Sequence, residues 1–139
     1  MAGKSSSFNM ERFFQALGDN TRLRLLNLME DQEICVCYFV EILGQGQPKI
    51  SRHLAYLRRA GIVEARRNGK WMHYRIVVPP NDGAAQVLRQ TLAWLKTERA
   101  MQADRMRLSK ACCSPAKFSA LQGAPLPSSI DFSTPLEAR

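Results

Sequence analysis

The chain has 139 residues and a formal net charge of +8 at pH 7, a size that suits a single domain. It contains no run of about 18 apolar residues, which excludes a membrane-spanning helix. The start, MAGKSSSFNMERFF, lacks the apolar core of a secretory signal, so the cytoplasm is the expected compartment. No Ser/His/Asp set, glycine-rich phosphate loop or pair of carboxylates in a pocket appears, so we do not expect an enzyme.

The first third of the chain predicts two helices. Residues 1–9 are mostly polar, and we expect them to be disordered. Residues 10–17 carry apolar side chains at helical spacing, and Gly18 ends that helix. Asp19 or Asn20 can cap a second helix, which stops near residue 31.

The segment ICVCYFVEIL, residues 34–43, is short and apolar, and alone it is compatible with a strand. We predict a helix, because a short glycine-containing turn follows it and Pro48 then stands where a first helical turn tolerates proline. Residues 48–60 form the next helix, with three aliphatic side chains on one face, and Gly61 suits its C-terminal end. These two helices make a helix-turn-helix.

Two strands, 62–67 and 71–77, are predicted after it. Asn68-Gly69 stands between them, and this dipeptide is a strong hairpin signal. A basic hairpin attached to a helix-turn-helix is the wing of a winged helix. The expected fold is therefore mainly α with a β-hairpin wing, an α+β winged helix-turn-helix.

Residues 79–83 break the chain, and residues 84–108 predict one long helix. Its apolar face is too long to be used only inside so small a domain, so we expect a homodimer through the first and last helices. The DNA-binding and dimerisation domain then spans residues 10–108. Residues 109–139 contain two cysteines, are rich in proline and serine near their end, and are expected to form a flexible tail.

The positive charge is concentrated in residues 45–75, which hold eight basic residues and one acidic residue, Glu64. Clustered basic residues often form only a solvated face, but here they coincide with a helix and a hairpin, which favours nucleic-acid binding. The N-terminal half of such a helix meets base edges in the major groove, and each phosphate contact steepens the salt dependence of binding by about one unit of slope. The candidates for DNA contact are Gln47, Lys49, Ser51, Arg52, His53, Tyr56, Arg66, Arg67 and Lys70.

The four cysteines form two close pairs, Cys35/Cys37 and Cys112/Cys113. In a reducing compartment, paired thiols suggest ligation of a soft metal, although cysteine is also a small apolar core residue. On a regular helix, Cys35 and Cys37 would be about 200° apart, so both bind one ion only if the backbone there is not helical. Either the pair lies at a frayed first turn, or binding unwinds that turn and acts as a switch.

Three segments resemble the ArsR/SmtB family of metal-sensing repressors, and most of all its arsenic-responsive members: ALGDNTRLRLLNLM, ICVC and QPKISRHLAYLRRAGIVEARRNGKWMHYRI. The resemblance covers roughly residues 10–96. It implies a dimeric winged-helix repressor of a resistance operon, bound to a palindromic double-stranded operator. It also implies release from DNA when a metalloid, As(III), Sb(III) or methylarsenite, binds cysteine thiolates, with no resident cofactor required.

The arsenic sensors of this family often take a third thiolate from about one turn after the second, where this chain has Val40. The expected metal ligands are therefore Cys35, Cys37, Cys112 and Cys113, combined in one site, across a dimer, or as a separate Cys112/Cys113 site. A two-thiolate site would suit a methylated arsenical. The alternatives are a Cd(II)- or Pb(II)-responsive repressor of the same family, a thiol-redox sensor, and an architectural protein with incidental cysteines.

Overall fold

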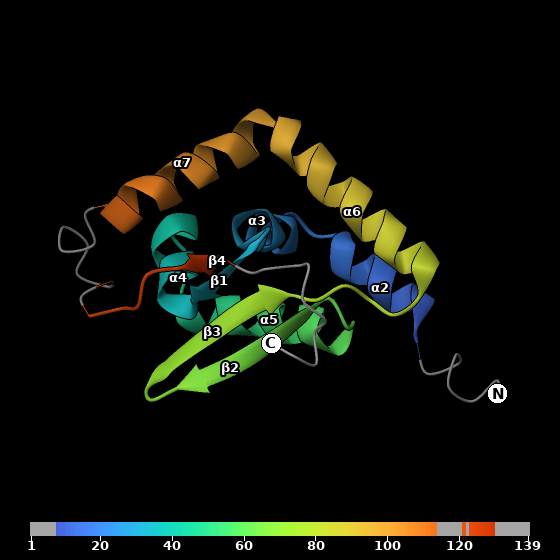
Figure 1. The fold of residues 1–139 in the computed structure, drawn as a ribbon, viewed down its shortest axis with the longest axis horizontal. Helices are drawn as coiled ribbons and strands as arrows, with labels where there is room; N and C mark the ends of the chain where they lie inside the picture. The colour runs from blue at the N-terminus through green and yellow to red at the C-terminus, as the bar shows by residue number, and fades with distance from the viewer. Residues whose placement is uncertain (1–7, 114–120, 122, 130–139) are drawn as a thin grey trace.

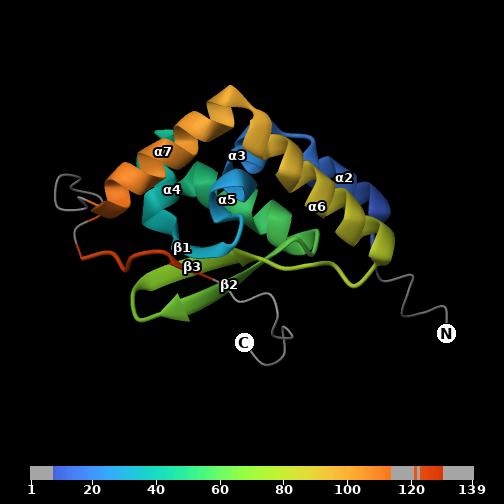
Figure 2. The same cartoon turned by 45° about the horizontal axis from the view of Figure 1, so that its top comes forward.

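A computed structural model describes residues 8–113, 121 and 123–129, and Figure 1 shows their arrangement. Helices form one layer over a small antiparallel sheet, with the hairpin projecting from the sheet (Figures 1 and 2). The elements are, in chain order, α2 (Met10–Leu17), α3 (Asn20–Met29), β1 (Gln32–Cys35), α4 (Val36–Leu43), α5 (Gln47–Arg59), β2 (Val63–Asn68), β3 (Trp71–Ile76), α6 (Asp82–Thr97), α7 (Arg99–Cys113) and β4 (Ser128–Ser129).

The first two helices begin at side-chain caps. The Asn9 side chain accepts from the backbone N–H of Arg12 at 2.8 Å, and the Asp19 side chain accepts from that of Arg22 at 3.1 Å. Each cap satisfies an N–H group that has no partner inside the helix. The predicted helices of residues 10–17 and 20–31 are confirmed, the second ending at Met29.

The prediction of one helix over residues 34–43 is wrong at its start. Ile34 and Cys35 are extended and pair with Tyr74 and His73 of β3, so the helix α4 begins only at Val36. The ladder to β3 outweighs the local helical preference of this short segment. Gly44 ends α4 with a left-handed backbone (φ 67°), and α4 and α5 form the predicted helix-turn-helix.

The wing is confirmed to within a residue at each strand. β2 and β3 pair antiparallel from Val63↔Ile76 to Asn68↔Trp71, and Gly69 supplies the positive φ of 64° that the turn requires. The sheet contains more than the hairpin, because its order is β2-β3-β1-β4. The sequence did not predict β1 or β4.

The prediction of one long helix over residues 84–108 is also wrong. Glu98 takes an extended backbone (φ −84°, ψ 132°), and the chain turns there into α7, which forms an elbow with α6 (Figure 1). α7 packs back on α3 and α4 and buries Met101 and Leu108. Arg24 of α3 holds it through two hydrogen bonds to the buried carboxylate of Asp104, at 2.7 and 3.0 Å.

α7 also runs further than the helix predicted for this region, through Cys113, so residues 109–113 are helical. Of the rest of the expected flexible tail, the structure describes only residues 121 and 123–129. In the expected disordered start, residues 1–7 lie outside the described residues. Within the described tail, Leu121 is fully buried and β4 pairs with β1 through Gln32 and Glu33.

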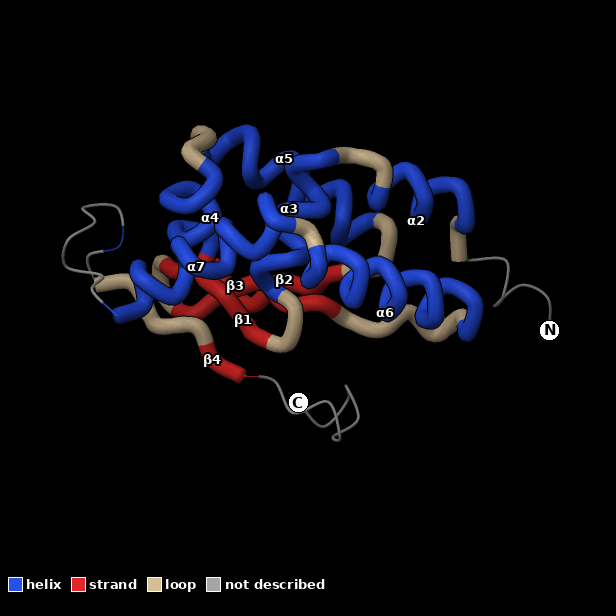
Figure 3. Tube along the Cα trace, turned by 90° about the horizontal axis from the view of Figure 1, so that it is seen from above, coloured by secondary structure: helices blue, strands red, loops and turns tan. Residues whose placement is uncertain are grey.

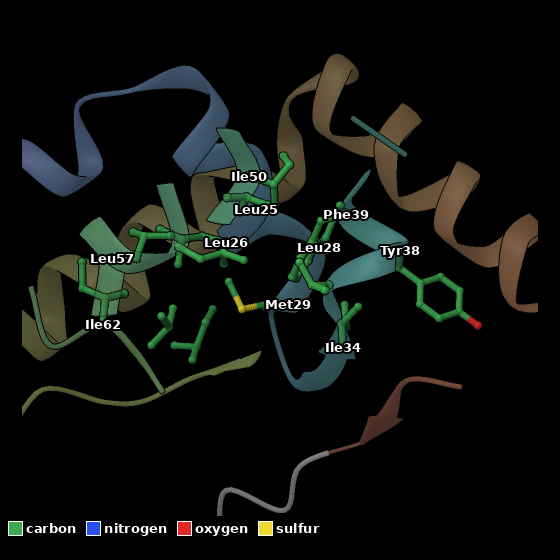
Figure 4. Packing of buried hydrophobic residues seen from close by; sticks show 14 of the residues in the cluster. Leu25, Leu26, Leu28, Met29, Ile34, Tyr38, Phe39, Ile50, Leu57 and Ile62 are labelled. Carbon is green, nitrogen blue, oxygen red and sulfur yellow. The ribbon is translucent and has the colours of Figure 1, made fainter. Parts of the chain in front are cut away.

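The core lies between the helices and the sheet. Figure 4 shows its close packing around α3, where Leu25, Leu26, Leu28 and Met29 are all essentially unexposed. Ile50, Leu54 and Leu57 of α5 are also fully buried, which fixes the rotation of that helix. The opposite side of α5 is therefore turned outward.

Candidate functional site

The outward side of α5 carries its predicted DNA-contacting residues near the N-terminal end. Gln47, Lys49 and Arg52 are exposed, and Ser51 is half-buried. Gly46 precedes the helix without a side-chain cap, and Pro48 occupies its first turn. The first backbone N–H groups of α5 are therefore free of a capping side chain, which suits contact with a phosphate group.

Two predicted DNA contacts, His53 and Tyr56, are half-buried and also contact other residues of the protein. His53 Nδ1 lies 3.2 Å from the Arg22 guanidinium and 3.8 Å from an Asp19 carboxylate oxygen. The Arg22 guanidinium stacks on the Tyr56 ring at 4.0 Å, and the Tyr56 hydroxyl donates to the Gln15 side chain at 3.2 Å. These contacts hold α5 against α2 and α3, so both residues contribute to the packing of α5, the helix expected to read the DNA.

The wing presents Arg66, Arg67 and Lys70 as exposed side chains. Arg67 and Lys70 stand near the hairpin turn, with the Lys70 ammonium 5.0 Å from the Trp71 ring centre. Arg66 forms a forked pair with Glu33 of β1, with its closest contact at 2.6 Å. The Arg66 guanidinium is the main cause that lowers the pKa of Glu33, so this pair ties the wing to β1.

The thiols of Cys35 and Cys37 meet at the start of α4. Cys35 is the last residue of β1, and the Cys37 thiol donates to the Cys35 sulfur across 3.0 Å. The extended backbone of Cys35 (φ −69°, ψ 142°) replaces the helical geometry that would have separated the two side chains. The sequence left open whether the two thiols meet at the first turn of the helix or only after that turn unwinds. In the structure they already meet at the first turn of α4.

The pair is arranged to share one proton. The Cys37 hydrogen bond is the main cause that lowers the pKa of Cys35 to about 7, against the opposing effect of burial, and backbone N–H groups of Cys37, Met72 and Val36 lower it further. The same bond, together with burial, raises the pKa of Cys37 far above its usual range. A thiolate is the form that binds a soft ion, so Cys35 is prepared for ligation at neutral pH.

We expect this pair to release its two protons in separate steps. In a Cys112→Ala/Cys113→Ala variant, ultraviolet thiolate absorbance should rise by one thiolate per protomer with a midpoint near the Cys35 pKa of about 7. Because that pKa lies below the usual value, Cys35 contributes stability at alkaline pH that is lost as the pH falls through neutrality. Two thiolates appearing together near the usual thiol pKa would contradict the arrangement.

The second cysteine pair lies at the end of α7, and its two thiols differ in burial. Cys112 is half-buried and packs against the core, whereas Cys113 is exposed. Cys112 also approaches α4: burial, followed by the charges of Cys112, Cys37 and Cys35, raises the pKa of Tyr38 to about 12. The charges of three thiols therefore act on one phenol, although among the described residues no three possible ligands already lie close enough together for a metal ion.

Sequence reasoning missed Tyr38 and Glu33. Both adjoin the cysteine pair in sequence, Tyr38 directly after Cys37 and Glu33 two residues before Cys35. Glu33 was not singled out because the strand that carries it was not predicted. Tyr38 had a signal that could have found it, since a tyrosine inside a largely apolar helix buries a hydroxyl that needs a partner.

A helix-turn-helix with an exposed basic reading face and a basic hairpin defines a winged-helix DNA-binding transcription regulator. Solved structures share this fold. HlyU from Vibrio cholerae N16961 superimposes with a TM-score of 0.54 at 23% identity, over 68% of this chain and 97% of that one. The repressor BigR from Xylella fastidiosa gives a TM-score of 0.50 at 32% identity, over 60% and 83%.

The sequence comparisons identify the family. Residues 19–65 match the model "Bacterial regulatory protein, arsR family". The arsenical resistance operon repressor of Escherichia coli K12 is 39% identical over 104 residues, which cover 74% of this chain and 87% of that protein. An arsenic resistance transcriptional regulator of Pseudomonas putida KT2440 is 50% identical over 64 residues, 45% of this chain and 50% of that protein.

The chain belongs to the arsR family of bacterial regulatory proteins. It is a DNA-binding transcriptional repressor, and its relatives are regulators rather than enzymes. Among the described residues, no helix is both long and apolar enough to span a membrane.

Proposed function

We propose that this repressor controls an arsenic or antimony resistance operon and leaves its operator when a trivalent arsenical or antimonite binds Cys35 and Cys37. The observation that carries the proposal is the 3.0 Å thiol pair, with one thiol prepared as a thiolate at the start of the helix-turn-helix. The most similar relatives named above regulate arsenic resistance, which supports the choice of ion.

The third ligand that we propose is Cys112 of the same protomer. As(III) is soft and favours thiolates, and α7 packs on α4 so that Cys112 acts on the same phenol as Cys35 and Cys37. Since these thiols do not yet form a three-ligand set, binding has to draw the end of α7 and the start of α4 together. The N-terminal half of α7 resists this movement, because Asp104 is paired with Arg24 and the Asn27 side chain donates to the Met101 carbonyl at 2.9 Å.

This movement would reach the DNA-reading elements directly. Cys35 pairs with His73 of β3, and Glu33 of the same strand β1 holds Arg66 of the wing. Cys37 lies on α4, which packs against the reading helix α5. An ion that pulls on both cysteines therefore favours a conformation in which wing and reading helix no longer match the operator, which is the differential binding that allostery requires.

Cadmium is the weaker candidate. A tetrahedral four-thiolate site would need Cys113 as well as Cys112, and Cys113 is exposed on a different side of α7. A three-thiolate pyramid needs only the thiols that approach Tyr38. The exposure of Cys113 therefore supports a trivalent ion over tetrahedral Cd(II).

We also propose a homodimer that pairs α2 and α6 across a two-fold axis. Both helices lie at the same end of the molecule (Figure 3), and each presents large apolar side chains to solvent: Phe14 is 50% exposed, Met10 66% and Trp94 67%. Trp94 also lines a shallow groove of α6 with Val87 and Thr91. A second copy would cover these residues and give two reading helices for the two halves of a palindromic operator.

Replacing Trp94 by glutamate should turn the dimer into a monomer at micromolar concentration, because a charge would be buried where an apolar ring is expected. Sedimentation equilibrium measures this, and Met106→Glu is the control, since Met106 is 63% exposed on α7, away from α2 and α6. A Trp94→Glu protein that sediments as the wild type does would contradict the proposed interface.

A reporter gene placed behind the DNA that precedes this protein's own coding region tests the proposed function in cells. We expect low expression with the wild-type repressor, and induction by arsenite or antimonite. Constitutive repression in the presence of both ions would contradict it, and selective induction by cadmium would favour the alternative.

A further inference from the structure

Tyr38 carries a buried hydroxyl that has no hydrogen-bond partner among the residues that the structure describes. Its side chain is fully buried, and its oxygen makes no hydrogen bond among the described residues. Figure 4 shows the ring extending away from the labelled aliphatic side chains, with the oxygen at its far end. Buried polar groups are nearly always hydrogen-bonded, so this phenol is available to donate a hydrogen bond to a ligand.

The phenol lies where the proposed arsenic site would form. Tyr38 follows Cys37 directly on α4, and α7 packs against this helix with Cys112 half-buried on the same core. The thiols of Cys35 and Cys37 are already in contact at the same helix start. Tyr38 is therefore the neighbour of the thiol pair in the chain, on the helix that contacts α7.

The chemistry of arsenous acid supplies an acceptor for this phenol. Each thiol that binds As(OH)₃ forms one As–S bond and breaks one As–O bond, and the thiol proton leaves with the hydroxide as water. Arsenic bound to Cys35 and Cys37 alone thus retains one hydroxyl, until a third thiol displaces it. Methylarsonous acid has only two hydroxyls and loses both to the same pair, which leaves a methyl group with no acceptor.

We propose that Tyr38 determines specificity among arsenicals by donating a hydrogen bond to the hydroxyl that arsenic retains on Cys35 and Cys37. This inference rests on the proposed function. A phenol is protonated at neutral pH and is a good donor to such an oxygen. The bond would favour capture of inorganic arsenite over methylarsonous acid, before Cys112 completes the site.

The test uses the full chain with Cys112→Ala and Cys113→Ala, so that only two thiols remain. Equilibrium dialysis against sodium arsenite or methylarsonous acid, with arsenic counted by mass spectrometry, gives both affinities. Adding Tyr38→Phe should weaken arsenite binding about fivefold, the effect of one hydrogen bond, and leave methylarsonous acid binding unchanged. Tyr74→Phe, a half-buried tyrosine of β3, is the matched control and should change neither affinity.

The outcomes separate this inference from the function on which it rests. If Tyr38→Phe leaves arsenite binding unchanged, or weakens both arsenicals equally, the specificity role is overturned while the thiol site stands. If the two-thiol protein binds neither arsenical, both the inference and the proposed capture by Cys35 and Cys37 are overturned. The arsenic-free Tyr38→Phe protein should also melt higher, since it no longer buries an unpartnered hydroxyl.

Discussion

Replacing Cys35 by serine is expected to keep the repressor on its operator at arsenite concentrations that release the wild-type protein. Serine oxygen is a poor ligand for a soft ion and is not ionised at neutral pH, so the variant loses the thiolate that the Cys37 hydrogen bond prepares. The arsenite concentration for half-release should rise by at least about 100-fold, because loss of an outer-shell partner alone costs about 10- to 100-fold and a direct ligand contributes more. Gel-shift titration with reduced protein measures it.

Folding should survive this change, because Cys35 is the residue before α4 and serine is favoured at that position. Cys113→Ser is the matched control, since Cys113 is the exposed cysteine and is not one of the three proposed ligands. We expect it to respond to arsenite as the wild type does. Equal sensitivity of the Cys35→Ser and wild-type proteins would remove Cys35 from the site.

The second large effect is expected at Arg52. Arg52 is exposed on the outward side of α5, within the half of the helix that meets base edges, and arginine pairs with guanine through two hydrogen bonds. Replacing it by alanine should weaken operator binding by roughly 10- to 100-fold, corresponding to about 1–3 kcal/mol. The loss should be smaller for DNA of unrelated sequence, because base contacts carry the specificity.

Arg59→Ala provides the control for charge alone. Arg59 is also exposed on α5 but stands at its C-terminal end, away from the expected base contacts. Both variants remove one positive charge, so a difference between their operator affinities is due to the position of the arginine on α5. If Arg59→Ala costs as much operator affinity as Arg52→Ala, then α5 acts only as a basic surface and does not read bases through Arg52.

Much of this fold could be predicted from local signals in the sequence. Asn68-Gly69 marks the hairpin, Asp19 marks a helix start and Gly44 a helix end, and each of these signals acts within a few residues. The break at Glu98 had no such signal. It depends on tertiary contacts instead, chiefly the pairing of Asp104 with Arg24, 80 residues away in the chain.

In the candidate site, too, local signals could be predicted from the sequence and tertiary contacts could not. The cysteines and basic residues could be selected by type and spacing, but their contacts depend on the fold. Extended backbone at Cys35, imposed by pairing with β3, is what brings its thiol to Cys37. The position of His53 on α5 could be selected from the sequence, whereas its contact with Arg22 of α3 could not.

The most direct test of the account is the fluorescence anisotropy of labelled operator DNA with the fully reduced protein, before and after saturation with arsenite. We predict a bound complex without arsenite, its dissociation when arsenic binds, and its return when a dithiol chelator removes the ion. If arsenic is bound by each protomer while the anisotropy of the DNA complex stays unchanged, thiolate ligation does not control this repressor.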